Sequence, residues 1–355
     1  MTKVPLLDLE RQYAPIKDRV LAAIKDVFDS KQFIQGPFVE AFEEKVAQYC
    51  KVKHAIAVSS GTDALLVALM ALNIGPGDDV ITSPFTFFAT GGSIARVGAT
   101  PVFVDIDPKT FNINPALIEK AITSKTRAIM PVHLFGQTAD MAAISDIARR
   151  HKLAVVEDAA QAIGATTCQG DLSCFSFFPS KNLGACGDAG LVATNNDSLA
   201  EKVKMLRVHG AKERYFHDVI GGNFRMDSIQ AAILSVKLES LEDQHRRRQE
   251  NAAYYDRHLK GVVTPFVTPG NRMIYNQYTI RSSERDKLRK RLEQAGVGCA
   301  VYYPIPLHLQ KCFGYLGYSG GSLPESEKAA AEVLSLPIFA ELTKQEMERV
   351  VAACA

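Results

Sequence analysis

Several features that mark particular classes of protein are missing from this chain of 355 residues. Its seven cysteines form an odd, scattered set without a Cys-x-x-Cys pair, which argues against a disulfide framework or a zinc site and predicts reduced thiols. No apolar stretch approaches the ~18 residues of a membrane-spanning helix, and residues 1–5 lack the apolar run of a signal peptide. These absences predict a cytoplasmic protein without a metal site or a membrane partner.

An excess of charge of one sign is missing as well. The 41 lysines and arginines nearly balance the 39 aspartates and glutamates, and the formal net charge is +2. Nucleic acids and anionic membranes attract proteins with an excess of positive charge, so this balance argues against both partners. The Gly-x-x-x-x-Gly-Lys-Ser/Thr loop of nucleotide-binding proteins is also absent. The composition, 47% hydrophobic and 23% charged, is typical of a soluble globular protein.

The length and the patterning of the chain predict two domains preceded by an arm. A chain of 355 residues exceeds one ordinary domain. Apolar residues recur at intervals of three and four within residues 7–30, as they do in a helix, and Gly36-Pro37 then breaks the chain. We therefore expect an N-terminal arm at 1–30, a large domain at 31–243 and a smaller C-terminal α/β domain at 244–355.

Short apolar runs alternate with helical patterns over the large domain. The runs occupy residues 55–58, 79–82, 101–104, 128–132, 154–156, 175–178 and 190–194, and helical patterns at 62–72, 115–121 and 140–151 lie between several of them. Continuous apolar strands separated by helices predict a mainly parallel sheet that helices cover on both faces. In such a sheet, ligands bind beyond the carboxyl ends of the strands. The expected fold class is therefore α/β, with helices on both sides of the sheet.

Other segments have mostly helical patterns. Apolar periodicity predicts helices at 38–49 and 227–243. Three consecutive arginines at 246–248 are compatible with nucleic-acid binding, but Glu250 and Asp256 follow, and a solvated helix face explains the run better. In the C-terminal part we expect a strand at 278–281, a charged helix at 285–295, a strand at 299–303 and helices from residue 325 onward.

Lys181 follows an apolar, aromatic run that we expect to be a buried strand, residues 175–178. An amine in apolar surroundings is poorly hydrated when charged, so its pKa falls and a neutral, nucleophilic fraction exists near neutral pH. Such a lysine suits the formation of an imine with a carbonyl compound. The alternative is an ordinary surface lysine at the end of a strand, which is the usual environment of this residue type.

Polar and aromatic residues collect at other predicted strand ends. Asp158 follows a buried strand, where an isolated carboxylate would be costly without a positive partner, although it also suits a helix cap. Gly61 and Thr62 begin a helix whose free N–H groups favour a phosphate, although ordinary capping also uses these residues. Phe87 offers an aromatic face to a planar ring, or a core contact.

Taken together, these residues match the requirements of one cofactor. Pyridoxal 5'-phosphate needs a lysine that forms an imine, a carboxylate that keeps the ring nitrogen protonated, and an anchor for its phosphate. Lys181, Asp158 and the turn at Gly61 supply these groups, and Phe87 supplies a stacking face. The residues therefore predict a pyridoxal-phosphate enzyme.

The sequence resembles the DegT/DnrJ/EryC1/StrS family of sugar-nucleotide aminotransferases, which are pyridoxal-phosphate enzymes of fold type I. The resemblance extends over nearly the whole chain. It rests on the segments Gln35-Gly36-Pro37, Ser60-Gly61-Thr62-Asp63-Ala64-Leu65, Pro76-Gly77-Asp78-Asp79-Val80, Val104-Asp105-Ile106-Asp107, His133-Leu134-Phe135-Gly136-Gln137, Glu157-Asp158-Ala159-Ala160-Gln161, Ser176-Phe177-Phe178-Pro179-Ser180-Lys181, Gly222-Asn223-Phe224-Arg225-Met226 and Tyr303-Pro304-Ile305-Pro306-Leu307-His308.

The resemblance implies a role for each cofactor-binding residue. Lys181 would bind the cofactor covalently and move the proton, and Asp158 would bind the pyridine nitrogen. Gln161 would contact the ring hydroxyl, and Phe87 would stack on the ring. The phosphate would be held by Gly61, Thr62 and Ser176, and by Asn223 of a neighbouring subunit, so that a homodimer shares its active sites.

The resemblance also implies residues on the substrate side. Arg225 would contact the sugar nucleotide or the carboxylate of the amino donor, and Tyr302, Tyr303 and His308 would line the substrate side of the site. For His308 a loop histidine between prolines is the alternative, since its spacing specifies no chemistry. Two departures from the family pattern are a segment at 164–171 that is shorter than usual and Ala189, where glycine is common.

The expected reaction is a ping-pong transamination. The amino group of an amino acid, expected to be glutamate by analogy with the family, would pass to a nucleotide-linked hexose for amino-sugar and polysaccharide biosynthesis. Lys181 favours transamination, because related sugar dehydratases carry histidine at that position. The motifs favour a 3-keto sugar linked to UDP or dTDP, with a 4-keto sugar as the alternative. A non-catalytic regulator that keeps the pyridoxal-phosphate fold is the alternative from another class.

Overall fold

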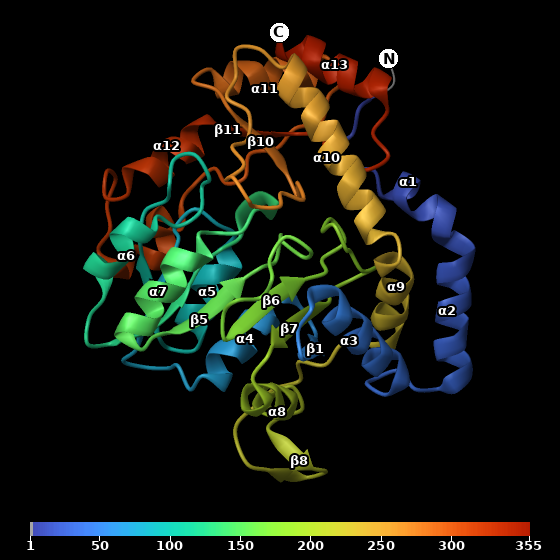
Figure 1. Ribbon diagram of the computed structural model, residues 1–355, viewed down its shortest axis with the longest axis vertical. Coiled ribbons are helices and arrows are strands. Elements are labelled where there is room, and N and C mark those ends of the chain that lie inside the picture. Colours follow the sequence, from blue (N-terminus) through green and yellow to red (C-terminus); the bar gives the residue numbers. More distant parts are fainter. Residues whose placement is uncertain (1–2) are drawn as a thin grey trace.

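The computed structural model describes residues 3–355, and a seven-stranded sheet forms its centre (Figure 1). The strand order is β1-β7-β6-β5-β4-β2-β3, and β7 runs antiparallel to both of its neighbours while the other pairs are parallel. The mainly parallel α/β architecture predicted from the sequence is confirmed. The strands are β1 (His54–Val58), β2 (Asp79–Thr82), β3 (Thr100–Phe103), β4 (Thr126–Met130), β5 (Ala154–Asp158), β6 (Leu172–Ser176) and β7 (Gly190–Thr194).

Helices cover both faces of this sheet, as the continuous apolar strands predict. Alternate residues of a strand face opposite sides, so Ile56 and Val58 pack with α4, whereas Ala57 packs with α3. Helices α4, α5 and α8 contribute to the core on one face, and α3, α6, α7 and α9 to the cores on the other. These helices are α3 (Pro37–Cys50), α4 (Gly61–Ala71), α5 (Phe88–Arg96), α6 (Pro115–Ala121), α7 (Met141–His151), α8 (Asp197–Leu206) and α9 (Ser228–Leu238), and a 3-10 turn, η2, spans Leu134–Gly136.

The C-terminal elements gather at one end of the molecule around a small antiparallel sheet of β10 and β11 (Figure 1). Their core also includes Phe85, Phe111 and Phe135 from the segments beyond the strands of the large sheet. The two groups of elements therefore share an apolar contact close to the strand ends. The C-terminal elements are α10 (Leu241–His258), β10 (Tyr278–Arg281), α11 (Arg285–Gln294), η3 (Leu307–Leu309), η4 (Lys311–Leu316), α12 (Pro324–Glu332), β11 (Val333–Leu336) and α13 (Lys344–Cys354).

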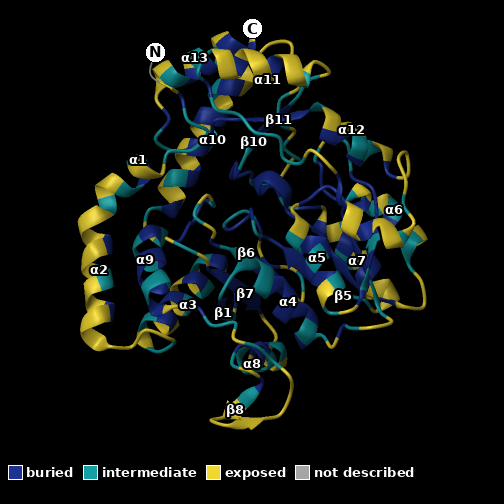
Figure 2. Cartoon of the chain, turned by 180° about the vertical axis from the view of Figure 1, so that it is seen from behind, coloured by how far each residue is buried: buried dark blue, intermediate teal, exposed yellow. Residues whose placement is uncertain are grey.

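The N-terminal segment packs on these C-terminal elements. Val4 forms a parallel bridge with Val297, and the Arg11 guanidinium donates two hydrogen bonds of 2.8 Å to the Glu346 carboxylate. Helix α2 then runs beside α9, with its outer face exposed (Figure 2). The elements of this segment are α1 (Leu9–Tyr13), η1 (Ala14–Ile16) and α2 (Lys17–Ser30). The predicted boundaries between arm, large domain and small domain, after residues 30 and 243, stay predictions.

Four predicted elements differ from the structure. The helices predicted from residue 325 onward are interrupted by strand β11. Strand β6 ends at Ser176 rather than at residue 178, because its pairing with the antiparallel neighbour β7 ends at Ser176 and Gly190. The helix predicted at 227–243 is two helices, separated where the Ser240 hydroxyl and N–H both donate to the Lys237 carbonyl. The strand predicted at 299–303 is reduced to an isolated bridge between Ala300 and Ser335.

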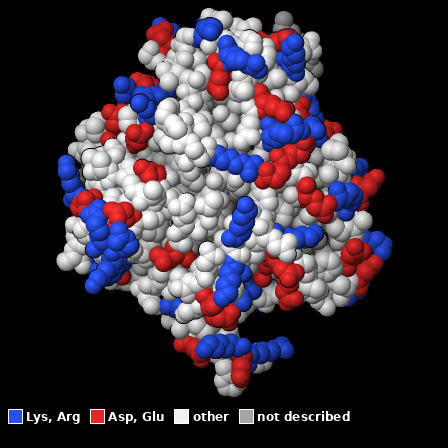
Figure 3. All heavy atoms as spheres, in the orientation of Figure 1, with Lys and Arg blue, Asp and Glu red and all other residues white. Residues whose placement is uncertain are grey.

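A small hairpin of β8 (Ala211–Glu213) and β9 (Phe216–His217) projects from the end of the molecule opposite the C-terminal elements (Figure 1). On the face of Figure 3, lysine and arginine side chains are interspersed with aspartate and glutamate. No helix formed by residues 3–355 combines the length and the apolar character needed to cross a lipid bilayer. The cytoplasmic location stays a prediction.

Candidate active site

The predicted catalytic residues lie beyond the carboxyl ends of β5 and β6. Asp158 is the last residue of β5, and Ser176 is the last residue of the adjacent β6. Lys181 follows Ser176 by five residues, in a turn closed by a 2.8 Å hydrogen bond from the Lys181 N–H to the Phe178 carbonyl. Because β5 and β6 are parallel, both ends meet at one edge of the sheet. The tertiary structure therefore brings the lysine and the carboxylate to the same place.

Lys181 has the electrostatic character of a nucleophilic amine. Burial lowers the pKa of its ammonium group from 10.5 to about 8, although the charge of Asp158 acts in the opposite direction. An appreciable neutral fraction therefore exists near neutral pH. This environment agrees with the prediction of a carbonyl-binding lysine, rather than with that of a fully hydrated surface lysine.

Asp158 is buried and accepts hydrogen bonds from neutral donors. The Thr90 hydroxyl donates to Oδ2 at 2.7 Å, and the Ala160 N–H donates to Oδ1 at 3.2 Å. Since the single Thr90 proton goes to Asp158, Thr90 accepts from the Thr86 hydroxyl, 2.9 Å away. Burial raises the pKa of Asp158 despite these bonds. A buried carboxylate whose hydrogen bonds come from neutral donors suits a cationic ligand, such as a protonated ring nitrogen.

The carboxamide of Gln161 is held at both ends. Its Oε1 accepts a 2.6 Å hydrogen bond from the Phe135 N–H, and its Nε2 donates to the Tyr303 hydroxyl over 3.1 Å. This arrangement fixes which end of the amide is the donor. Gln161 and Tyr303 are thus brought together with the Phe135 turn, as parts of one site.

Gly61 begins α4 at a point where the chain lies against the end of β6. A Cβ on Gly61 would come within 2.5 Å of the Ser176 Cβ, and a Cβ on Gly190 would come within 2.3 Å of the Ser60 carbonyl carbon. Both positions therefore need glycine for close approach. The Ser60 hydroxyl caps the Asp63 N–H at 3.0 Å, so the N–H groups of Gly61 and Thr62 are the first in the helix without an intrahelical acceptor.

The helix start, the glycine cradle and Ser176 form an anion-binding geometry. The N–H groups and the positive end of the helix dipole favour a phosphate at the start of α4. Ser176 lies directly against this turn, as the role predicted for it requires. The turn therefore suits the phosphate of a cofactor whose other end reaches Lys181.

Phe87 precedes α5 and remains 58% exposed, which is unusual for an aromatic side chain with only a packing role. Its ring centroid lies 6.3 Å from that of Tyr303. The ring is thus accessible to a planar ligand in the same region as Gln161 and Tyr303. Tyr302 is half-buried, and its ring lies 5.9 Å from that of Tyr303.

Asn223 and Arg225 lie elsewhere. They form a 2.8 Å hydrogen bond from the Arg225 Nε to the Asn223 Oδ1, and both line a pocket of about 430 Å³ whose lining does not include Lys181. Their segment pairs with the end of β1, because Arg225 bridges Val58. The predicted contacts of Asn223 with a cofactor and of Arg225 with substrate are thus not part of the Lys181 site within this chain.

His308 is buried and forms a hydrogen bond of 3.1 Å between its Nε2 and the Glu327 carboxylate. Its Nδ1 has no hydrogen-bond partner among residues 3–355. Glu327 also accepts from the Gly321 and Leu323 N–H groups, so the pair fixes the loop before α12. A direct contact between His308 and substrate stays a prediction.

The two departures from the family pattern are accommodated in the core. Ala189 is buried, and its carbonyl accepts a 2.8 Å hydrogen bond from the Phe177 N–H without a positive φ at Ala189. In the short segment at 164–171, the Thr166 hydroxyl and the Gly170 N–H both donate to the Glu157 carboxylate. Neither departure removes a group from the site around Lys181.

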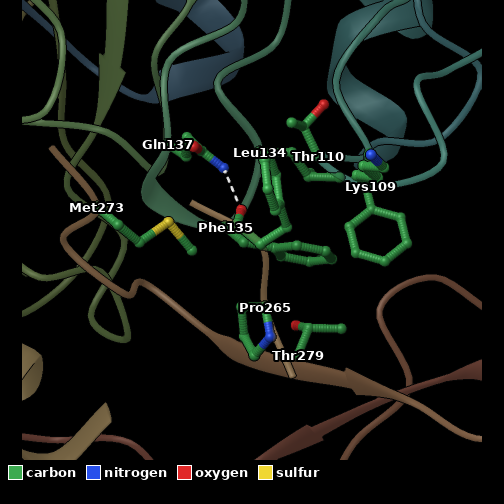
Figure 4. A pocket seen from close by; sticks show the side chains of 10 residues that line it. Lys109, Thr110, Leu134, Phe135, Gln137, Pro265, Met273 and Thr279 are labelled. Carbon is green, nitrogen blue, oxygen red and sulfur yellow. Dashed lines mark hydrogen bonds between the residues drawn. The ribbon is translucent and has the colours of Figure 1, made fainter. Parts of the chain in front are cut away.

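Several functional contacts were not predicted. Thr90 donates to Asp158, which lies 68 residues later in the chain, and Thr86 orients Thr90. No local sequence pattern marks either threonine. Phe135 contributes a backbone N–H, which any residue type would supply, so its identity carries no signal. Phe135 also lines a cavity of about 10 Å³, together with Gln137 and Phe266, which are joined by a hydrogen bond from the Gln137 Nε2 to the Phe266 carbonyl (Figure 4). It is too small for more than about one water molecule.

The model of the DegT/DnrJ/EryC1/StrS aminotransferase family matches residues 15–355. The chain belongs to this family. The predicted family, and with it the prediction of an aminotransferase, are confirmed. Among residues 3–355 there is no group of three or more His, Cys, Asp or Glu side chains that could hold a metal ion.

Three similar proteins illustrate the range of members of the family. A pleiotropic regulatory protein of Geobacillus stearothermophilus is 52% identical, over 98% of this chain and 96% of its own length. A UDP-N-acetyl-3-dehydro-alpha-D-glucosamine 3-aminotransferase of Acidithiobacillus ferrooxidans is 44% identical, over 98% of this chain and 96% of its own length. The crystal structure of NtdA from Bacillus subtilis, with bound cofactor PMP, is 36% identical and superimposes with a TM-score of 0.95 over 100% of this chain and 85% of NtdA.

Proposed function

We propose that this aminotransferase binds pyridoxal 5'-phosphate and transfers the amino group of an amino acid to a keto group of a nucleotide-linked hexose. One observation carries the proposal: Lys181, whose pKa is lowered to about 8, shares the edge of the sheet with the buried carboxylate of Asp158. A neutral amine beside a carboxylate without a cationic hydrogen-bond partner matches the two ends of a pyridoxal ring.

The residues of the site fit this cofactor. Asp158 would bind the ring nitrogen, Gln161 the ring hydroxyl, and Lys181 the aldehyde carbon. The cradle of Gly61 and Ser176 would hold the phosphate, because a Cβ at residue 61 would fill it. When bound, the cofactor supplies an electron-withdrawing ring and a temporary carrier for the amino group. The PMP-bound relative NtdA supports this assignment.

The chain's own groups then provide the proton transfer. The Lys181 amine, neutral in part near neutral pH, would accept at Nζ the proton that leaves the α-carbon of the amino donor, and would return it to the cofactor carbon bonded to the donor's nitrogen. Asp158 keeps its negative charge close to the ring nitrogen, with Thr90 and Ala160 fixing both of its oxygens. Phe87 and Tyr303, whose ring centroids lie 6.3 Å apart, would contact the bound ring.

The overall reaction exchanges an amino group for a carbonyl oxygen. The amino donor, for which we propose glutamate, becomes the corresponding 2-oxo acid. The keto carbon of the sugar loses its oxygen and gains the amino group, so no external oxidant or reductant is needed. For the sugar we propose a 3-keto hexose linked to UDP or dTDP, supported by the name of the 3-aminotransferase relative. A 4-keto sugar is the alternative.

We further propose that two copies of the chain share their active sites. Asn223 and Arg225 line a pocket of their own, beside the end of β1. Within one chain they do not complete the Lys181 site. A partner subunit that supplies these groups would complete the phosphate and substrate contacts.

A regulatory role is the second candidate, because one relative carries the name of a regulatory protein. Such a role does not require a nucleophilic lysine or a buried carboxylate, and this chain has both. The geometry therefore favours catalysis.

The test is a two-step absorbance experiment. The purified protein is reconstituted with pyridoxal phosphate and mixed with glutamate, and we expect the visible band of the lysine-bound cofactor to disappear. Addition of nucleotide-linked 3-keto and 4-keto sugars then identifies the substrate that restores the band, and mass spectrometry identifies the product. The Lys181→Ala variant is expected to lack the band from the start. A wild-type protein that binds the cofactor but does not respond to any amino donor would favour the regulatory role.

A further inference from the structure

A second buried carboxylate lies directly beside Asp158. Glu157 and His133 are both 0% exposed, and the His133 Nε2 lies 2.6 Å from the Glu157 Oε2. Neither residue belongs to the cofactor-binding set proposed above. Buried ionisable groups are costly and are found where they have a function, in stability or in tuning a site.

The hydrogen bonds define the protonation of this pair. The His133 Nδ1 accepts a 3.1 Å bond from the Ala139 N–H, so Nδ1 carries no proton. The ring proton is therefore on Nε2, which donates to Glu157, and the imidazole is neutral. His133 thus acts as a hydrogen-bond donor rather than as a cation.

Glu157 accepts further bonds from neutral donors only. These are the Thr166 hydroxyl at 2.7 Å, the Ser173 hydroxyl at 3.0 Å and the Gly170 N–H at 2.5 Å. Burial disfavours the charged form, but all four groups that contact its two oxygens are donors, so Glu157 accepts these bonds as a carboxylate. Glu157 therefore remains an anion without a neighbouring cation to balance it.

The backbone couples this anion to Asp158. The His133 N–H donates to the Asp158 carbonyl at 3.0 Å, while its ring holds Glu157. Since successive side chains of a strand point to opposite faces, Glu157 lies behind the sheet edge from which Asp158 reaches the site. The other titratable groups near the two carboxylates are Lys181 after β6, Cys174 on β6, Cys168 in the 164–171 segment, and Tyr303 beside Gln161.

We propose that Glu157 is a positioning residue that supplies a fixed negative charge behind Asp158 and, through His133, holds the Asp158 backbone, so that the ring nitrogen of the bound cofactor stays protonated. The inference rests on the proposed function, because it concerns the same cofactor. It assigns a role to the short 164–171 segment as well, since Thr166 and Gly170 stabilise the charge of Glu157.

The test compares Glu157→Gln with the wild-type holoenzyme by titrating the visible absorbance of the cofactor against pH. Glutamine keeps the shape and loses the charge. Removal of a nearby negative charge disfavours protonated forms of the cofactor. The absorbance pKa, at which the visible absorbance of the bound cofactor changes, is therefore expected to fall. For an effective dielectric constant of about 20, the expected fall is about half a unit or more. Glu157→Asp, which keeps the charge, is expected to recover most of this shift.

A matched control separates electrostatics from stability. Asp105 is another buried carboxylate, and it accepts bonds from the Glu325 N–H and from the N–H and hydroxyl of Ser326 at the start of α12. Asp105→Asn is expected to lower the melting temperature but to leave the absorbance pKa unchanged. If Glu157→Gln behaves in the same way as Asp105→Asn, Glu157 has a structural role alone and the inference is wrong.

A second variant keeps the inference testable if Glu157→Gln does not fold. Thr166→Val removes a donor that stabilises the charged form of Glu157, so part of the negative charge is lost and the absorbance pKa is expected to fall, by less than in Glu157→Gln. An unchanged or higher absorbance pKa in that variant overturns the inference. A wild-type protein that shows no visible band with pyridoxal phosphate contradicts the proposed function itself, and the two failures are thereby distinguished.

Discussion

Asp158 shows how individual side chains set the chemistry of this site. Its carboxylate is buried, yet the groups that donate to it are a hydroxyl and a backbone N–H, both neutral. Thr90 is itself oriented by Thr86, so the direction of each hydroxyl proton is determined. Such a carboxylate is prepared for one additional, cationic partner. The surroundings of this carboxylate therefore favour a ligand that places a positive charge next to Asp158.

Lys181 gives a prediction for the dependence of stability on pH. Its pKa is about 8 in the folded protein, compared with 10.5 for an ordinary lysine, so between these values the unfolded chain binds more protons at this amine. The free energy of unfolding of the cofactor-free protein should therefore gain a contribution as the pH rises from about 8 towards 10.5. Lys181→Met should lose this contribution and unfold at a higher urea concentration than the wild type at neutral pH.

Urea denaturation of the cofactor-free protein at several pH values measures this effect. Replacement of the exposed Lys45 by methionine is the control, and it should leave the pH profile of the wild type intact. Parallel profiles for Lys181→Met and the wild type would show that Lys181 is well hydrated in the folded state.

At the scale of secondary structure, the site depends on how the start of α4 meets the ends of β6 and β7. Gly61 faces Ser176, and Gly190 faces the Ser60 backbone. The contact between helix and strands is so close that neither glycine position has room for a methyl group. The same closeness directs the first N–H groups of α4 towards the region in which we place the phosphate.

Gly61→Ala is therefore expected to destabilise the cofactor-free protein by about 1–3 kcal/mol, because the new Cβ forces the helix away from β6. Cofactor binding should weaken at the same time, since the phosphate cradle is distorted. Ser176→Gly in the same chain removes the atom that clashes and should restore part of the stability. Chemical denaturation and a fluorescence titration with pyridoxal phosphate provide the two measurements.

Gly75→Ala is the matched control for this pair. A Cβ at Gly75 would meet its nearest atom at 3.7 Å, an ordinary contact, and the backbone there does not require positive φ. This substitution should therefore leave both stability and cofactor binding close to those of the wild type. Equal losses in Gly61→Ala and Gly75→Ala would show that the cradle is not the cause.

At the scale of the whole molecule, the positions of Asn223 and Arg225 are the central question. They lie together at the end of β1, and the pocket that they line does not include Lys181. We have proposed that they act on the site of a second copy. A subunit with a defective lysine and a subunit with a defective Asn223 would then carry complementary lesions.

Mixing Lys181→Ala and Asn223→Ala subunits tests this arrangement. Each mixed dimer would have one site with both lesions and one site with neither, so an equal mixture should recover roughly a quarter of the wild-type transfer rate. Each variant alone should be almost inactive. Subunit exchange is verified with two affinity tags, and exchange without recovered activity would place all catalytic groups within one chain.

Much of this fold follows from local patterns in the sequence. Alternation of short apolar runs with helical periods predicts the strands of the large sheet, because a parallel strand that is buried on both faces must be continuously apolar. The pairing of Lys181 with Asp158 was also accessible, since each follows such a run. The errors occurred at ends and breaks: β6 stops where its pairing with β7 ends, and Ser240 interrupts an otherwise continuous helical pattern.

The sequence by itself determined the class of fold and predicted Lys181 and Asp158 as a catalytic pair, because these inferences depend on residue type and on short-range spacing. Only the tertiary structure decided what surrounds them. Thr90 reaches Asp158 across 68 residues, and His133 reaches Glu157 across 24. These contacts depend on the order and register in which the strands pair, which local periodicity does not encode. The burial of the second carboxylate, on which its proposed effect on the cofactor depends, is likewise a property of the assembled sheet.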